Sequence, residues 1–179
     1  MNLDALRVKP TLTGPSVRLV PLGARHAQAM FASTADDELR RLTGTHRQFT
    51  LEEIQDWCAG RAEQPDRLDL AIESPSGELL GEVALTSVDV HNASASVRIA
   101  LFGKENLGRG IGRAALALLL DYAFGTVRLH RVWLEVFAFN ERAIRAYRAC
   151  GFEVEGRLRD ALWWGGQWHD ALLMAVLAP

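Results

Sequence analysis

The stretch from Ala95 to Ala123 constrains the fold of this chain more than any other. Residues 96–102 are rich in Val, Ile and Leu, which is typical of a short strand. A glycine-bearing segment, residues 103–110, interrupts the strand. From Ile111 onward, apolar residues recur at the spacing of one helix face. A strand, a loop and a helix therefore follow one another directly, which predicts an α/β arrangement.

The loop of this unit has the features of an anion site. Gly108, Gly110 and Gly112 carry no side chain, so a ligand can approach the backbone closely. The first N–H groups of the following helix lack internal partners and lie at the positive end of the helix dipole. We therefore expect a phosphate or pyrophosphate here.

The two common nucleotide motifs fit this loop poorly. Residues 110–115 match the loose G-x-G-x-x-A pattern, but several polar residues separate them from the strand, unlike in a dinucleotide-binding fold. A P-loop would close on Gly-Lys-Ser/Thr, whereas Arg113 follows Gly112. An ordinary glycine-rich turn and a dinucleotide site remain as weaker alternatives.

Composition narrows the class of protein. With 179 residues, 49% of them apolar, the chain is predicted to form a single domain over residues 1–179. A net charge of −2 argues against general binding to nucleic acid or anionic membranes. Cys58 and Cys150 lack metal-ligand spacing, so no metal is expected. The start shows no signal-peptide pattern, which favours a cytoplasmic protein.

The rest of the chain predicts a mixed α/β (α+β) domain. Its sheet has about seven strands, an antiparallel meander followed by a central parallel pair, and about four flanking helices. Thr50 and Glu53 form a capping box, which sets the start of one helix. Strand patterns cover residues 17–22, 68–72, 79–88, 96–102, 130–136, 152–163 and 167–177. Helical patterns cover residues 24–33, 50–62, 111–122 and 141–150, with a short helix and loop within residues 36–48.

The second informative stretch covers residues 131–152. Asn140 precedes a helix and is expected to cap it. Tyr147 lies on the inward face of that helix, where a tyrosine is commonly a core residue. Because this helix follows the strand expected beside residues 96–102, the Tyr147 hydroxyl is also within reach of a ligand between the two strand ends.

Taken together, these pieces resemble the GNAT superfamily of acyl-CoA-dependent N-acetyltransferases, in particular its RimJ/RimL-like branch of ribosomal-protein N-terminal acetyltransferases. The resemblance covers nearly the whole chain. It rests on the strand at 17–22, Leu80-Gly81-Glu82-Val83, the loop 108–112, Asn140-x-x-Ala143-Ile144-x-x-Tyr147 with Gly151-Phe152, residues 155–160, and Gly165-x-x-x-x-Asp170. The loop departs from the family's usual Q/R-x-x-G-x-G/A pattern, because Leu107 stands at its first position.

The resemblance implies a GNAT fold whose parallel strands splay apart at the cofactor site, and acetyl-CoA as co-substrate. Backbone N–H groups of the loop would hold the pyrophosphate, and the pantetheine arm would lie between residues 99–101 and 133–136. Further cofactor contacts would come from the helix that Asn140 caps. The implied cofactor-binding residues are Ile99, Ala100, Leu101, Leu107, Gly108, Arg109, Gly110, Ile111, Gly112, Arg113, Asn140, Ala143 and Tyr147. Arg145 and Arg148 join Arg109 and Arg113 as phosphate contacts, unless they form a solvated helix face.

For catalysis the resemblance implies direct attack by an amine in a ternary complex. A backbone N–H near Leu101 would stabilise the oxyanion, and Tyr147 would protonate the leaving thiolate. Glu82 is the first choice of general base. Glu135 is the second, and it fits a structural function in its strand nearly as well.

The sequence does not identify the acceptor amine. A protein N-terminal amine leads, a polyamine or other small amine follows, and a non-catalytic acyl-CoA-binding regulatory domain is the alternative from another class. His169 either lines the acceptor groove or lies at the surface. Trp163, Trp164 and Trp168 cluster at the final hairpin, which indicates either an acceptor pocket or a homodimer contact.

Overall fold

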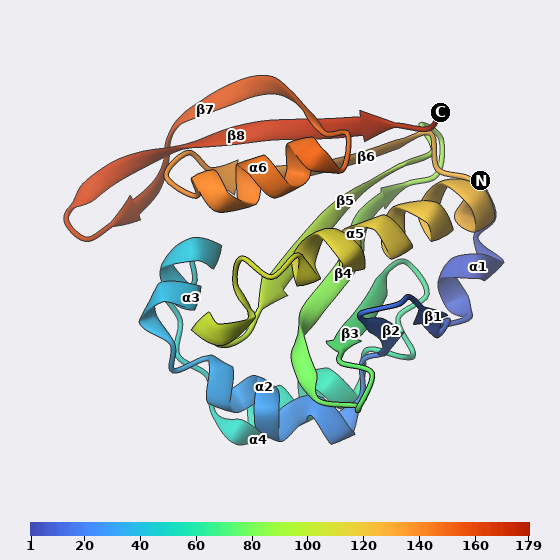
Figure 1. Ribbon diagram of the computed structural model, residues 1–179, viewed down its shortest axis with the longest axis horizontal. Coiled ribbons are helices and arrows are strands. Elements are labelled where there is room, and N and C mark those ends of the chain that lie inside the picture. Colours follow the sequence, from blue (N-terminus) through green and yellow to red (C-terminus); the bar gives the residue numbers. More distant parts are fainter.

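A computed structural model describes residues 1–179 and contains one eight-stranded sheet in the order β1-β2-β3-β4-β5-β6-β8-β7 (Figure 1). The strands are β1 Leu12–Thr13, β2 Arg18–Pro21, β3 Leu68–Glu73, β4 Leu79–Asp89, β5 Ser94–Leu101, β6 Arg131–Phe137, β7 Glu153–Trp164 and β8 Gln167–Leu177. The α-helices are α1 Asp4–Arg7, α2 Ala27–Ser33, α3 Asp37–Thr43, α4 Leu51–Ala59, α5 Ile111–Tyr122 and α6 Glu141–Ala149.

All neighbouring strands are antiparallel except β5 and β6, which are parallel. The predicted mixed α/β class, with its meander and central parallel pair, is therefore confirmed. The sheet has eight strands instead of seven because β1 has only two residues, too few to show an alternating pattern. Six helices replace the expected four, since α1 is a single turn and the region before α4 holds two separate helices. None of the helices has the length and apolar character needed to cross a membrane.

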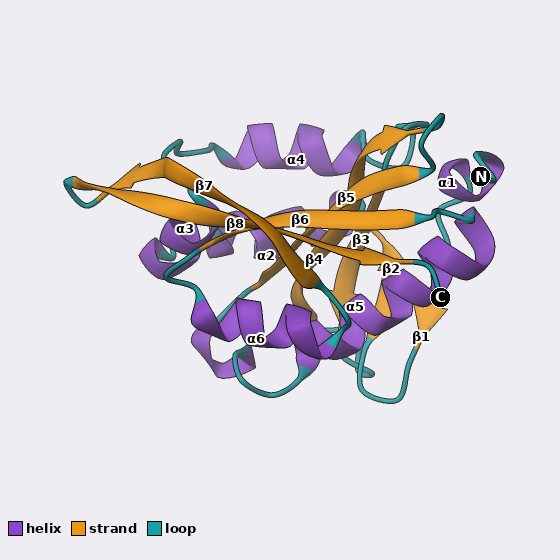
Figure 2. Cartoon of the chain, turned by 90° about the horizontal axis from the view of Figure 1, so that it is seen from above, coloured by secondary structure: helices purple, strands orange, loops and turns teal.

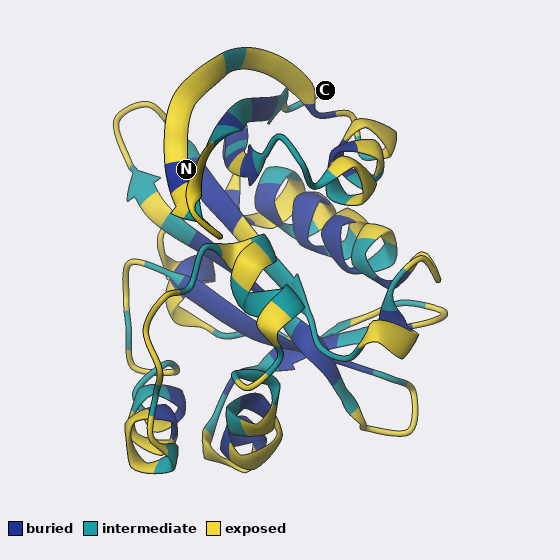
Figure 3. Cartoon of the chain, turned by 90° about the vertical axis from the view of Figure 1, so that its left-hand side faces the viewer, coloured by how far each residue is buried: buried dark blue, intermediate teal, exposed yellow.

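The helices lie on both faces of the sheet (Figure 2). Helices α5 and α6 cover one face, where Leu70 of β3 shares a core with Leu119 of α5. Helices α2 and α4 cover the other, where Ala71 packs with Met30 and Cys58. Successive residues of β3 thus enter opposite cores, which explains why the whole strand is buried. By contrast, β7 is largely exposed (Figure 3).

Short polar signals set the helix boundaries that frame the site. The Thr50–Glu53 capping box is present at the start of α4, as predicted. The Ala143 N–H donates to Asn140 Oδ1 at 3.2 Å, so the predicted cap of α6 is also confirmed. A further cap comes from Asp36, whose carboxylate accepts from two backbone N–H groups of α3. Each such cap contributes about 1 kcal/mol.

Candidate active site

The site begins where the parallel strands separate. Strands β5 and β6 pair at three positions, the last of which joins Ser96 to Trp133. Beyond this point β5 continues to Leu101 and β6 to Phe137 without facing each other. Each strand stays paired on its outer side, β5 with β4 and β6 with β8. The sheet therefore opens into a wedge between two fixed strands.

Free backbone groups line this wedge. The Phe102 N–H donates to Leu80 O at 2.8 Å, toward β4. Because backbone groups alternate in direction along a strand, those of Ile99 and Leu101 point the opposite way, into the wedge. The Ala138 N–H donates to Asp170 O at 2.8 Å, and the same alternation directs the backbone groups of residues 135 and 137 into the wedge. An extended ligand can pair here as an added strand.

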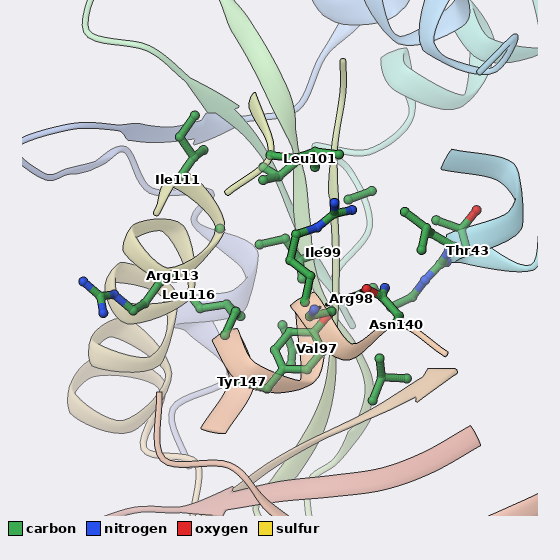
Figure 4. Close-up of a pocket in the computed structure, with 18 of the residues that line it drawn as sticks. Thr43, Val97, Arg98, Ile99, Leu101, Ile111, Arg113, Leu116, Asn140 and Tyr147 are labelled. Atoms are coloured by element: carbon green, nitrogen blue, oxygen red, sulfur yellow. Dashed lines mark hydrogen bonds between the residues drawn. The ribbon is translucent and has the colours of Figure 1, made fainter. Parts of the chain in front are cut away.

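A cavity of about 980 Å³ runs through the wedge (Figure 4). It extends from the glycine loop and α6 on one face of the sheet to β4 and α3 on the other. Of the catalytic and cofactor-binding residues that the resemblance implies, the cavity brings together all except Arg109, which is exposed and outside its lining. The predicted residues that line it are Glu82, Ile99, Ala100, Leu101, Leu107, Gly108, Gly110, Ile111, Gly112, Arg113, Asn140, Ala143 and Tyr147.

The glycine loop presents its backbone to the cavity. Gly108 and Gly110 have φ values of 74° and 79°, a region that side chains rarely adopt. Gly110 directly precedes α5, which has no side-chain cap. The first helical bond runs from the Ala114 N–H to Gly110 O. The N–H groups of residues 111–113 thus remain for a ligand, an arrangement that suits a pyrophosphate.

Two of the four arginines considered for phosphate contacts lie at the cavity. Arg113 of α5 and Arg145 of α6 belong to its lining. Arg109 and Arg148 do not, and both are exposed. The structure also contains no cluster of three or more His, Cys, Asp or Glu side chains that could hold a metal ion.

Tyr147 is buried in the wall formed by α6, where its ring lies 5.9 Å from that of Phe152. It is drawn beside Asn140 and Val97 at the cavity in Figure 4. Burial raises the pKa of Tyr147 to about 12, and the nearby Cys150 adds to this shift. The phenol therefore stays protonated across the physiological range and can donate a hydrogen bond into the cavity.

Glu82 lies in the middle of β4 and lines the opposite end of the cavity. Burial raises the pKa of its carboxyl group, while the positive charge of Arg98 acts in the opposite direction. The backbones of β4 and β5 approach closely here: a Cβ on Gly81 would lie 2.2 Å from Ala100 O. Glu135, the second choice of base, also lines the cavity but is exposed.

Helix α3 also borders the cavity, within the stretch of residues 24–62 whose irregular helical pattern suggests the lip of a substrate site. Leu39, Leu42 and Thr43 belong to the lining. The Glu38 carboxylate lies 3.8 Å from Lys104 Nζ and 3.9 Å from an Arg142 guanidinium nitrogen, so α3 contacts both sides of the opening. The apolar spacing of residues 39 and 42 and the capping Asp36 were the local signals for this helix, but neither indicates where it packs.

The tryptophans of the final hairpin lie away from the cavity. Trp163 and Trp168 pack on each other at 5.1 Å and are 48% and 57% exposed. Trp164 packs on His46 instead. The His169 Nε2 lies 3.3 Å from Trp164 O, and its ring meets Phe139 edge-on. None of these side chains lines the cavity.

Known proteins share much of this chain. It is 31% identical over 106 residues to the spermidine N(1)-acetyltransferase of Vibrio cholerae, an alignment covering 59% of this chain and 61% of that protein. It is 34% identical over 101 residues to a putative ribosomal N-acetyltransferase of Bacillus subtilis, covering 56% and 55%. The chain therefore spans less than two thirds of the length of either relative.

A solved structure extends the likeness of fold to almost the entire chain. Spermidine N-acetyltransferase from Vibrio cholerae, in complex with CoA and spermine, superposes with a TM-score of 0.84 at 22% identity, covering 92% of this chain and 96% of that one. At this identity the match shows the fold alone. In addition, residues 16–153 match the sequence model of the acetyltransferase (GNAT) domain family. Most of the chain is covered by this match, and the protein therefore belongs to the GNAT acetyltransferase family.

Proposed function

We propose that this protein is an N-acetyltransferase that transfers the acetyl group of acetyl-CoA to a primary amine. The observation that carries the proposal is the position of the wedge beyond Ser96 and Trp133, directly beside the backbone N–H groups that begin α5. A diphosphate and an extended acyl arm need these two features side by side. Membership of the GNAT family supports the same activity.

Different segments of the chain bind different parts of acetyl-CoA. The N–H groups of residues 111–113 hold the pyrophosphate, with Arg113 and Arg145 adding positive charge. The backbone of residues 99–101 pairs with the pantetheine amides. Acetyl-CoA supplies the reactive thioester. A backbone N–H of β5 near Leu101 is available to the thioester oxygen as charge develops on it.

Two side chains handle protons at opposite ends of the reacting centre. Glu82 accepts the proton of the acceptor ammonium group, which leaves the nitrogen lone pair free to attack. Tyr147, which stays protonated, donates to the sulfur of the leaving CoA thiolate. Burial raises the pKa of both groups. An acceptor ammonium entering the cavity draws the Glu82 carboxyl toward its charged form.

For the acceptor, we infer that a polyamine such as spermidine is the leading class. The support is the relation to spermidine N(1)-acetyltransferases, one of which has nearly the same fold. Two carboxylates, Glu82 and Glu135, line the cavity and suit a cationic amine. A protein N-terminus, as in RimJ/RimL-like enzymes, is the second candidate, and the putative ribosomal N-acetyltransferase among the relatives favours it.

An assay of thiol release from acetyl-CoA tests the proposal. The amines are spermidine, putrescine and synthetic peptides with free or blocked N-termini, and mass spectrometry identifies each acetylated product. We expect thiol release only when a free amine is present, with spermidine ahead of the peptides. Preference for a free peptide N-terminus would support the second candidate. Tight binding of CoA without transfer to any amine would instead indicate the regulatory, non-catalytic domain.

A further inference from the structure

One charged side chain at the amine end of the cavity has no part in the function proposed so far. Arg98 is the single charged residue of β5, and it lines the cavity. Its guanidinium group takes part in no salt bridge, whereas Arg142 and Arg145, which also line the cavity, do. Arg98 is exposed, so its charge is free to act on other groups that line the cavity.

The strand register places Arg98 diagonally beside Glu82. Glu82 pairs with Ala100, and Arg98 pairs with Ala84, so all four side chains lie on one face of the sheet. Diagonal neighbours of this kind are within reach of long side chains. Both charged groups line the same cavity, and no other cation of β5 is available to Glu82.

The other charged groups around Glu82 balance its charge only in part. On β3, Asp69 lies on the same face, opposite Ala84, and adds a like charge. Arg67 also lowers the pKa of Glu82, by less than Arg98 does, but it is engaged with Asp69 through two hydrogen bonds of 2.7 Å. On α4, the pKa of Cys58 is raised to about 11, first by burial and then by the charge of Glu82, so this thiol stays neutral.

Across the wedge, the only charged side chain that β6 adds to the cavity is a further carboxylate, Glu135. Helix α3 adds only uncharged side chains. Of the two cations that lower the pKa of Glu82, Arg98 has the larger effect, and only Arg67 is held in a salt bridge. Burial raises the pKa of Glu82 and so disfavours its carboxylate form. The positive charge of Arg98 lowers this pKa and so favours the carboxylate.

We propose that Arg98 is a positioning residue that keeps the Glu82 carboxylate charged, and thus able to accept the proton of the acceptor amine. The inference rests on the proposed function and adds a residue to it. In the step concerned, a proton moves from the ammonium nitrogen of the acceptor to a Glu82 oxygen, and the Arg98 charge is unchanged. Arg98 therefore acts through Glu82 and not on the substrate.

The first test is the pH dependence of kcat/KM for spermidine in Arg98→Gln and Arg98→Lys. We expect Arg98→Gln to lose about tenfold in kcat/KM on the acidic limb and to approach wild type at alkaline pH, because the uncompensated carboxyl group holds its proton to higher pH. Arg98→Lys keeps the charge and should restore the wild-type kcat/KM at acidic pH. Arg113→Gln, at the phosphate end of the same cavity, should raise the KM for acetyl-CoA without shifting the acidic part of the pH profile.

A second measurement requires no activity. The Glu82 carboxyl carbon is titrated by ¹³C NMR in protein labelled at glutamate, and its signal is assigned by its absence in Glu82→Gln. We expect the midpoint to rise in Arg98→Gln and to return in Arg98→Lys. Equal midpoints in wild type and Arg98→Gln would overturn the inference, whatever the enzyme acetylates. Absence of thiol release with every amine would count against the proposed function alone, since the titration still reports on Arg98.

Discussion

Ser96 of β5 and Trp133 of β6 form the last pair of the only parallel ladder in the sheet. The two strands can part beyond this pair because each is held on its other side, by β4 and by β8. The wedge is therefore a rigid feature of the fold, and its free backbone groups are available before a ligand arrives. Preorganisation of this kind lowers the cost of ordering a long, flexible acyl arm.

Gly110→Ala tests the backbone character of the anion site. A side chain at φ 79° costs roughly 1 kcal/mol, although the space around Gly110 is open. Relief of this strain turns the first N–H groups of α5 away from the cavity. We expect the KM for acetyl-CoA to rise about tenfold with little change in kcat. Gly77→Ala serves as the control, since Gly77 has φ 90° and open space but lies in the β3–β4 turn. An equal KM in the two variants would contradict the assignment.

The contrast between Asn140 and α3 shows which parts of the site are predictable from the sequence. Asn140 caps the helix that it precedes, and the glycines of residues 108–112 lie at a helix start, because both features depend on neighbours in the chain. The resemblance to a family also implied the splayed strands. The position of α3 depends instead on tertiary contacts, among them its packing against β5 and the ion pairs of Glu38 with two distant segments. No local pattern encodes such contacts.

Arg98 illustrates an intermediate case. Its place as the one charge within an apolar strand was visible in the sequence, but its proximity to Glu82 depends on the register between β4 and β5. In that register the two backbones approach closely at Gly81, a contact that a pattern of residue types does not reveal. Arg109 is the opposite case, because its place in the loop suggested a phosphate contact, yet the structure leaves it outside the cavity.

Tyr147→Phe tests the proton donor. The substitution removes only the hydroxyl group, so packing against Phe152 is kept and CoA affinity should stay nearly unchanged. We expect kcat to fall about a hundredfold, the usual effect of losing a general acid. Steady-state kinetics and calorimetric titration with CoA measure the two quantities. Unchanged turnover would assign protonation of the thiolate to water or another group.

Glu82→Gln is expected to separate activity from stability. Loss of the base should lower kcat/KM by about a hundredfold. Stability should change in the opposite direction. Because burial raises the pKa of Glu82 in the folded state, the native protein binds the proton more tightly than the unfolded chain does. The free energy of unfolding of wild type therefore falls as pH rises from the ordinary value of 4.5 through the folded-state pKa.

Glutamine carries no charge and so removes the cost of burying the Glu82 carboxylate. Glu82→Gln should therefore melt at a higher temperature than wild type at pH 8, and the two melting temperatures should be closer at pH 5. Thermal unfolding followed by circular dichroism at both pH values measures the difference. Glu135→Gln is the control, because Glu135 is exposed and no penalty of burial is expected there. A lower melting temperature for Glu82→Gln at pH 8 would show that the carboxylate stabilises the fold.

The homodimer stays a prediction, carried by the exposed pair Trp163 and Trp168 near the tip of the β7–β8 hairpin. We expect light scattering to give twice the mass of one chain for wild type and the mass of one chain for the double variant Trp163→Ser, Trp168→Ser. The variant should keep its acetyl-CoA affinity, because neither side chain lines the cavity. A monomeric wild type would remove the dimer interpretation of these residues.

Gly44→Ala tests whether α3 shapes the acceptor end of the cavity. Gly44 ends α3 with φ 66°, and a Cβ there would lie 2.8 Å from the Phe137 ring and 3.3 Å from Leu162. The left-handed backbone costs about 1–2 kcal/mol and the overpacking about 1–3 kcal/mol more, or the loop moves to relieve both.

Since Leu42 and Thr43 line the cavity just before Gly44, such a shift should raise the KM for the amine while leaving that for acetyl-CoA nearly unchanged. The melting temperature should also fall by more than in Gly77→Ala, which shares the positive φ but meets no neighbour. The acceptor half and the cofactor half of the cavity are built from different elements, and the split between the two KM values measures that division directly. If both KM values rise together, α3 supports the cavity as a whole and does not select the amine.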